Sequence, residues 1–149
     1  MQEQEKQRAE PPAANSRRDD PRVAAPPRAS EGTALYVHLP FCAAKCHYCD
    51  FFSVPDEGQD IDAMIAAILS EAAERAPRRP RTVFLGGGTP SLLSPSQLKT
   101  LLDGLHMITG WRESATEVTA ECNPESLDLE KARCLLDLGV PRLSVGFQS

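Results

Sequence analysis

Three cysteines lie close together in the first third of the chain, at positions 42, 46 and 49, directly after the apolar run 35–39. Three thiols in one short loop can converge on a single polynuclear centre. Iron–sulfur clusters are usually held by four thiolates, so a set of three leaves one iron free to bind a substrate or cofactor. The spacing therefore predicts an open iron–sulfur cluster that carries chemistry at its free iron.

Three other interpretations compete with the open cluster. His38 could join the three cysteines in a Cys3His zinc site, but His38 lies in a strand-like alternation and no second ligand pair follows. A disulfide framework is disfavoured, because the five cysteines are an odd number and no secretory signal precedes them. Packing of three unrelated buried thiols would poorly explain why the cysteines lie so close together beside the polar residues Lys45, His47 and Asp50. The open cluster is the favoured interpretation.

Strands and helices alternate after residue 33. Apolar runs predict strands, and apolar positions at helical spacing predict the segments between them as helices. This regular alternation is typical of parallel strands joined by right-handed crossovers. The strands are expected over residues 34–39, 81–85, 117–121 and 142–147, and the helices over 61 to about 77, from 95 past 105, and over 128–138.

The helix boundaries have sequence signals of their own. Ser94 is the expected N-cap of the second helix and Pro95 its first residue. Gly139 is expected to end the third helix, whose buried stripe would include Cys134. Cys122 is likewise expected to be structural. The buried stripe of the second helix is expected to comprise Leu98, Leu101, Leu102 and Leu105.

The polar signals all follow strand ends. The cysteine loop follows the first strand and the glycine run 86–88 follows the second, while Glu121 and Gln148 end the third and fourth. Barrels and open α/β folds place their chemistry at the carboxyl ends of parallel strands. The sequence therefore predicts the first half of a (β/α) barrel with a site at this edge.

The cysteine motif, with Tyr48 before its last cysteine, resembles the signature of the radical S-adenosylmethionine (SAM) superfamily. The blocks 35–42, 84–93 and 142–149 narrow the resemblance to the branch of oxygen-independent coproporphyrinogen III oxidases and the related haem chaperones of the HemW type. The resemblance runs from about residue 34 to the last residue. It implies the N-terminal half of a partial (β/α)6 TIM-like barrel.

The resemblance also implies roles for individual residues. Cys42, Cys46 and Cys49 would each bind one iron, and SAM would bind the remaining iron. Without the resemblance, the glycine run is a tight turn or a place of close ligand approach, and it lacks the Gly-Lys-Ser/Thr ending of a phosphate loop. The cofactor-binding residues implied are Tyr36, Tyr48, Gly87, Gly88, Thr89, Glu121 and Gln148.

Phe51 distinguishes the two members of this branch. Coproporphyrinogen oxidases carry a further cysteine two positions after the third, where this chain has Phe51. The resemblance therefore favours a haem chaperone over an oxidative decarboxylase, and whether the protein is an enzyme stays open. A zinc-stabilised α/β fragment without catalysis is the third possibility. The partners implied are SAM, haem or a porphyrinogen, a haem-accepting protein and an electron donor.

Composition limits the other partners and the location. The formal charge of -5 and the pI near 5.2 argue against nucleic acid, and no apolar run approaches the roughly 18 residues of a membrane span. Since no signal or transit peptide opens the chain, a cytoplasmic protein is expected. Residues 1–32, rich in Pro, Ala, Arg and Glu, are expected to be a disordered tail. Residues 33–149 would form an incomplete radical SAM core domain, as a fragment of a longer protein.

Overall fold

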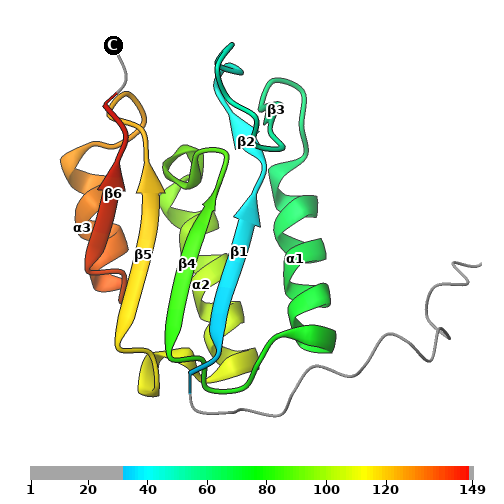
Figure 1. Ribbon diagram of the computed structural model, residues 1–149, viewed down its shortest axis with the longest axis vertical. Coiled ribbons are helices and arrows are strands. Elements are labelled where there is room, and N and C mark those ends of the chain that lie inside the picture. The colour runs from blue at the N-terminus through cyan, green and yellow to red at the C-terminus, as the bar shows by residue number, and fades with distance from the viewer. Residues whose placement is uncertain (1–31, 148–149) are drawn as a thin grey trace, which may run out of the picture.

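The computed structural model describes residues 32–147, and these form an α/β unit with four parallel strands (Figure 1). The predicted tail, apart from Gly32, and the predicted site residue Gln148 lie outside the described residues. The main sheet has the strand order β1-β4-β5-β6. The predicted α/β class with parallel strands is confirmed. Its strands are β1 (Ala34–Leu39), β4 (Thr82–Gly87), β5 (Glu117–Cys122) and β6 (Arg142–Val145).

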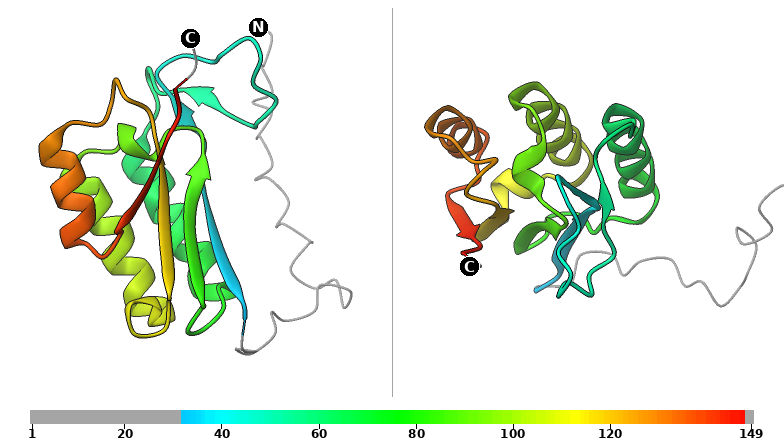
Figure 2. Two further views of the ribbon diagram at one scale, coloured as in Figure 1. Left: turned by 60° about the vertical axis from the view of Figure 1, so that its left-hand side comes forward. Right: turned by 90° about the horizontal axis from the view of Figure 1, so that it is seen from above.

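Three helices lie on one face of this sheet, as Figure 2 shows from above. They are α1 (Ile61–Arg75), α2 (Pro95–Thr109) and α3 (Leu129–Asp137), and each connects two neighbouring strands of the sheet. Two short 3-10 helices, η2 (Pro90–Leu92) and η3 (Trp111–Glu113), flank α2. In a (β/α) barrel the helices lie outside and the opposite face of the sheet lines the interior. The helices on one face of this sheet therefore agree with the predicted barrel half.

The core lies between the sheet and the helices. In β1, Leu35, Val37 and Leu39 are buried, whereas Tyr36 and His38 point to the opposite face. Val37 pairs in register with Leu85 of β4. The whole predicted stripe of α2 is fully buried, as is Trp111 behind it. Burial of these side chains fixes which residues of each strand remain on the open face.

The helix caps follow the sequence signals. Ser94 and Gln97 form a capping box: the Gln97 backbone N–H donates to Ser94 Oγ at 3.3 Å, and the Ser94 N–H donates to Gln97 Oε1 at 3.0 Å. Pro95 is the first helical residue, as predicted. Asp128 caps α3 by accepting from the Lys131 N–H at 2.7 Å. Gly139, with φ of +93°, follows the end of α3.

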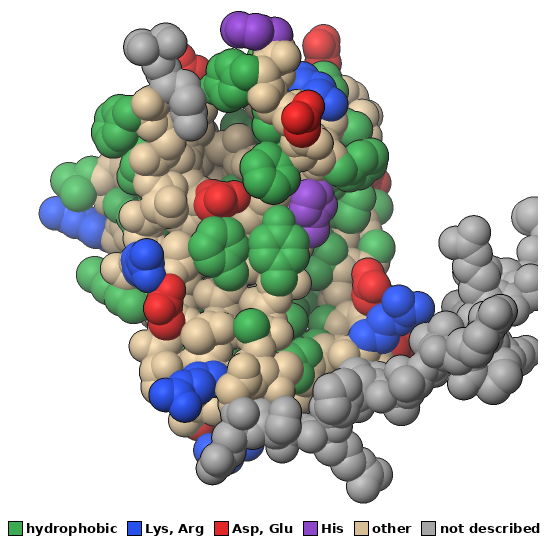
Figure 3. Space-filling view, viewed as in Figure 1, with side chains coloured by type: hydrophobic (Ala, Val, Ile, Leu, Met, Phe, Trp, Pro, Cys, Tyr) green, Lys and Arg blue, Asp and Glu red, His purple; other side chains and the backbone are tan. Residues whose placement is uncertain are grey.

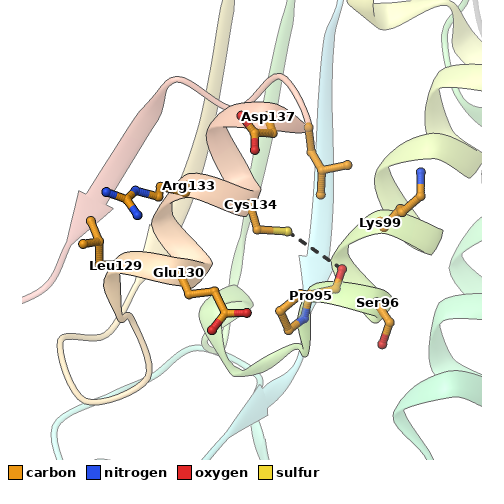
Figure 4. Close-up of a pocket in the computed structure, with 9 residues that line it drawn as sticks. Pro95, Ser96, Lys99, Leu129, Glu130, Arg133, Cys134 and Asp137 are labelled. Carbon is orange, nitrogen blue, oxygen red and sulfur yellow. Dashed lines mark hydrogen bonds between the residues drawn. The ribbon is translucent and has the colours of Figure 1, made fainter.

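One prediction about the helices is wrong. Cys134 was expected in the core, but it is only half-buried and lines a groove of about 850 Å³ between α2 and α3 (Figure 4). Its sulfur lies 4.0 Å from the Pro95 carbonyl oxygen. The buried residue of this short helix is the next one, Leu135, because the face that α3 presents to the sheet is one position further along.

Candidate functional site

The cysteine loop is closed at its base by a small parallel pair of strands that the sequence did not predict. β2 (Phe41–Cys42) pairs with β3 (Val54–Pro55). The Val54 N–H donates to the Pro40 carbonyl at 2.8 Å, and the Asp56 N–H donates to the Cys42 carbonyl at 3.0 Å. The loop thus leaves the carboxyl end of β1 and returns to it (Figure 1).

The three cysteines of the loop differ in exposure. Cys46 is exposed, while Cys42 and Cys49 are half-buried. A hydrogen bond from the Cys49 N–H to the Cys46 carbonyl, 3.1 Å long, closes a turn between them. Tyr48 lies beside this turn, and its hydrogen bond with the Cys46 side chain raises the pKa of the Tyr48 phenol. The loop therefore presents its thiols toward solvent and toward the strand ends.

The glycine run packs directly on the base of the cysteine loop. The Gly88 N–H donates to the Leu39 carbonyl at 2.7 Å, and the Thr89 N–H donates to the Phe41 carbonyl at 2.7 Å. A Cβ on Gly88 would lie 2.4 Å from the Phe41 carbonyl oxygen. Gly88 is therefore required by the contact between two parts of the chain, whether or not a ligand also approaches it.

Gly87 connects the glycine run to Glu121. Its φ of +108° is a conformation that favours glycine, and its N–H donates to Glu121 Oε2 at 3.1 Å. The same carboxylate oxygen would lie 2.8 Å from a Cβ on Gly86. Gly87 thus fixes the Glu121 side chain by donating to it, and Gly86, without a Cβ, leaves room for the carboxylate.

These segments surround one cavity of about 640 Å³ at the carboxyl ends of the strands. Pockets of about 300–1,000 Å³ are typical of small-molecule sites. Figure 3 shows the surface hollowed between the cysteine loop and the end of β6. The groove between α2 and α3 is larger but contains none of the predicted site residues. Eight predicted site residues line the cavity: Cys42, Cys46, Tyr48, Cys49, Gly87, Gly88, Thr89 and Glu121.

Tyr36 is not among the residues that line this cavity. Its ring stacks on Phe84, with centroids 6.0 Å apart, on the open face of the sheet. Burial, and secondarily the charge of Glu121, raise the pKa of the Tyr36 phenol. Tyr36 therefore lies on the same face as the cavity but below its described lining, and its contact with a cofactor stays a prediction.

The cavity also has lining residues that sequence analysis did not single out. Asn123 follows β5, and Ser144 is paired in register with Glu121 on β6. Cys122 is buried, as expected for a structural residue, but it also contributes to the lining. Its burial raises the pKa of its thiol. Their position in the sequence could have identified them, because each lies within a few residues of the carboxyl end of a predicted strand.

A buried serine fixes the turn that carries Asn123. Ser91 is fully buried, and its hydroxyl lies 2.6 Å from that of Ser126. The Asn123 N–H donates to Ser91 Oγ at 3.0 Å. The Lys131 ammonium donates to the carbonyls of Ser91 and Ser126, at 2.6 and 2.9 Å. The wall of the cavity beyond Glu121 is therefore held by a connected set of hydrogen bonds.

The donor set fits an iron–sulfur cluster. Three thiols line one cavity, and soft thiolates are the ligands of such clusters. The Thr89 hydroxyl donates to Cys42 Sγ at 3.7 Å, a contact of the kind that tunes cluster potentials. Within residues 32–147, no three or more His, Cys, Asp or Glu side chains are close enough together to hold a single metal ion. A four-iron centre needs its thiols further apart than one ion does.

The proposed fourth zinc ligand is otherwise engaged. His38 Nε2 lies 2.9 Å from the Phe52 carbonyl oxygen, and Nδ1 lies 3.2 Å from Tyr36 Oη. Both ring nitrogens therefore have hydrogen-bond partners, and His38 does not line the cavity of the cysteines. This arrangement argues against the Cys3His zinc site.

Comparison with protein families and curated proteins gives consistent results. The family described as the radical SAM superfamily matches residues 36–149. "Heme chaperone HemW" of Bacillus subtilis is 38% identical over 120 residues, covering 78% of this chain and 32% of that protein. The Lactococcus lactis protein of the same name is 41% identical over 116 residues, covering 78% of this chain and 30% of its own length.

Two further relatives extend the comparison. The bovine protein "Radical S-adenosyl methionine domain-containing protein 1, mitochondrial" is 37% identical over 128 residues, covering 83% of this chain and 29% of that protein. Among solved structures, coproporphyrinogen III oxidase (HemN) from Escherichia coli, described as a radical SAM enzyme, superposes with a TM-score of 0.63. It is 27% identical, covering 78% of this chain and 28% of that chain. The chain thus spans about a third of the length of these relatives.

Among residues 32–147, none of the helices has both the length and the apolar character that crossing a bilayer requires.

Proposed function

This chain belongs to the radical SAM superfamily, and on that premise we propose that Cys42, Cys46 and Cys49 hold a [4Fe-4S] cluster whose remaining iron binds SAM. The observation that supports this most directly is the shared cavity, which brings the three thiols together with the glycine run and Glu121. We further propose residues 33–149 as part of a radical SAM core domain.

The residues of the chain would divide the binding work. When bound, the cluster supplies an electron for reductive chemistry on SAM. The Thr89 hydroxyl donates to Cys42 Sγ and so stabilises negative charge on that thiolate. Glu121 offers carboxylate oxygen to the hydroxyl groups of a nucleoside, and the Gly87 N–H fixes its orientation. Tyr48 and Phe51 form the apolar side of the cavity and restrict access of water to it.

For the whole protein we propose a haem chaperone that delivers haem to an acceptor protein. The support is twofold. Relatives 36–41% identical carry the name heme chaperone HemW, and Phe51 takes the position at which the resemblance to coproporphyrinogen oxidases would require a cysteine. Phe51 is 65% exposed at the edge of the cavity, so an apolar side chain replaces the additional thiol there.

The test begins with anaerobic reconstitution of the protein with iron and sulfide. We expect a brown protein that contains four irons and four sulfides and whose reduced electron paramagnetic resonance spectrum changes when SAM is added. A colourless protein that contains one zinc ion would overturn the cluster and both functions built on it. A reconstituted cluster with an unchanged spectrum would overturn the proposed SAM site.

The second candidate function is oxidative decarboxylation of coproporphyrinogen III. The structural likeness to HemN, at a TM-score of 0.63, favours it. Incubation of the reconstituted protein with coproporphyrinogen III, SAM and a reductant distinguishes the two. Formation of protoporphyrinogen would establish the oxidase and contradict the chaperone, whereas stoichiometric haem uptake without porphyrinogen turnover supports the chaperone.

A further inference from the structure

His38 occupies the junction of three segments of the site without lining the cavity itself. It lies on the open face of β1, where it is half-buried and paired in register with Gly86. Its Nε2 lies 2.9 Å from the carbonyl oxygen of Phe52, fourteen residues further along the chain. Phe52 belongs to the returning arm of the cysteine loop, three residues after Cys49.

The hydrogen bonds of His38 show which of its two ring nitrogens carries the hydrogen. A carbonyl oxygen only accepts, so Nε2 must carry the hydrogen that is donated to Phe52. In a neutral imidazole Nδ1 is then an acceptor, and the Tyr36 hydroxyl, 3.2 Å away, donates to it. His38 therefore receives a hydrogen bond from its own strand and passes one to the cysteine loop.

The His38 ring is also in contact with the glycine run. A Cβ on Gly87 would lie 2.5 Å from two atoms of the ring and 3.0 Å from Nε2. The Nδ1–Cε1–Nε2 side of the His38 ring thus packs against Gly87, the residue whose N–H holds Glu121. Phe52, by contrast, is 71% exposed and its ring is tilted over His38 with centroids 6.2 Å apart. The hydrogen bond that the Phe52 carbonyl accepts comes from His38.

From these contacts we propose that His38 is a positioning residue: its Nε2–H holds the Phe52 carbonyl and so fixes the arm of the loop that follows Cys49 against Gly87. His38 ligates no metal in this role and acts through the backbone of the loop. The inference rests on the proposed function, because it assigns His38 to the positioning of the cluster-binding loop.

The peptide bond between Phe52 and Ser53 allows a direct test. Chymotrypsin cleaves after phenylalanine, so the carbonyl that it must attack at this bond is the one that His38 holds. Cleavage requires the Phe52 carbonyl to be released, and the rate then follows the population of the opened loop. The bonds after Tyr48 and Phe51, which are also exposed residues of the loop, serve as internal references.

Two amide substitutions distinguish the roles of the two ring nitrogens of His38. The terminal amide of His38→Gln can place a donor near the position of Nε2, whereas that of His38→Asn reaches only the position of Nδ1. In apo protein we expect H38N to raise the cleavage rate after Phe52 about fivefold, the effect of losing one ordinary hydrogen bond. H38Q should stay close to the wild type, and so should Tyr36→Phe, which removes only the bond to Nδ1.

A second measurement follows the cluster. In reconstituted protein we expect H38N to lose iron to a chelator faster than H38Q, with thermal unfolding of the two variants alike. Equal cleavage rates after Phe52 in H38N and the wild type would overturn the positioning role. So would equal cleavage and equal iron loss in H38N and H38Q, including the case in which both variants fail to fold. If the wild type takes up no cluster while H38N is still cleaved faster after Phe52, the proposed function fails and the hold on the loop stands.

Discussion

The hydroxyl of Thr89 donates a hydrogen bond to the sulfur of Cys42, across a distance of 3.7 Å. Thr89 follows the glycine run of β4, whereas Cys42 opens the cysteine loop after β1. The two segments are also joined through their backbones, because the Thr89 N–H donates to the Phe41 carbonyl at 2.7 Å. The first cysteine is therefore positioned by a neighbouring strand end as well as by its own loop.

Removal of the Thr89 hydroxyl should change the redox potential of the cluster. Hydrogen bonds to the sulfurs stabilise the more negative, reduced state, so Thr89→Val is expected to make the reduction potential more negative. Redox titration followed by electron paramagnetic resonance measures this. Thr100→Val is the matched control, since the Thr100 hydroxyl donates to the Ser96 carbonyl on the exposed face of α2. Equal reduction potentials in Thr89→Val and Thr100→Val would contradict the proposed effect of the Thr89 hydrogen bond on the cluster.

Replacement of each loop cysteine should remove the cluster. Cys42→Ser, Cys46→Ser and Cys49→Ser are each expected to abolish nearly all iron and sulfide binding, because a cluster with two thiolates has lost half of the usual ligands. Cys134→Ser is the control, since Cys134 lies in the groove between α2 and α3. Iron analysis after anaerobic reconstitution decides the matter. Loss of iron in the control as well would show a general folding defect.

Neutralisation of Glu121 should weaken SAM binding. Glu121→Gln keeps an oxygen that can accept from the Gly87 N–H but lacks the charge, and hydrogen bonds to charged groups are stronger by about 1 kcal/mol. We expect about fivefold weaker affinity for SAM, measured by equilibrium dialysis of the reconstituted protein. Glu125→Gln, in the exposed turn beyond β5, should bind SAM as the wild type does. Unchanged affinity in E121Q would exclude Glu121 from the nucleoside site.

A side chain at Gly88 should destabilise the fold. The Cβ of Gly88→Ala would lie 2.4 Å from the Phe41 carbonyl oxygen, which is backbone and cannot rotate away. Overpacking of this kind costs about 1–3 kcal/mol in the free energy of unfolding, measured by urea titration. In Gly104→Ala the new Cβ meets the Leu69 side chain, with the two methyl groups at 2.6 and 2.8 Å. Leu69 is only half-buried and can turn aside, and alanine favours the helix. That control should lie near or above wild-type stability.

Asp103 should make stability depend on acid pH. Hydrogen bonds from Lys99 and Arg112, at 2.6 and 2.7 Å, lower the pKa of Asp103. A carboxyl group with a lowered pKa stabilises the fold above its ordinary pKa, and the stabilisation is lost as the pH falls through the lowered value. Asp103→Asn should therefore unfold at lower urea than the wild type at pH 7, and the difference should shrink below about pH 4.

The control for this pH dependence is Asp137→Asn, which changes an exposed carboxylate near the end of α3. It should unfold at nearly the same urea concentration as the wild type at both pH values. A constant difference between D103N and the wild type from pH 7 to pH 3 would show that the Asp103 carboxylate charge contributes nothing to folding.

Sequence signals predicted the elements whose causes are local. The cap residue Ser94 gave the start of α2, because its side chain bonds the backbone three residues later. Asp128 was expected as the first residue of the third helix and is its N-cap instead. The alternation of buried and open positions in residues 34–39 likewise gave β1. The pair β2–β3 was missed, since strands of two residues have no period that a sequence can reveal.

The site was predicted as a set of strand ends, but not as a geometry. The rule that parallel strands carry chemistry at their carboxyl ends placed Glu121 beside the glycine run, where the structure has it. Alternation shows which face Tyr36 occupies but not its depth along β1, so its separation from the cavity lining could not be foreseen. The hydrogen bond between His38 and the Phe52 carbonyl joins residues at the two ends of the cysteine loop. No local sequence signal specifies the path of that loop, so this bond could not be predicted.

The closed neck of the cysteine loop bears on how the centre is matured. The pairing of Phe41 with Val54 ties the two arms of the loop to each other, and the Thr89 N–H holds Phe41 beside the end of β4, while Cys46 stays at the surface. Metal loading therefore requires ordering of only the short segment between these arms. On the proposed function, iron and sulfide can therefore reach the cysteines from the solvent after folding, without reopening the core.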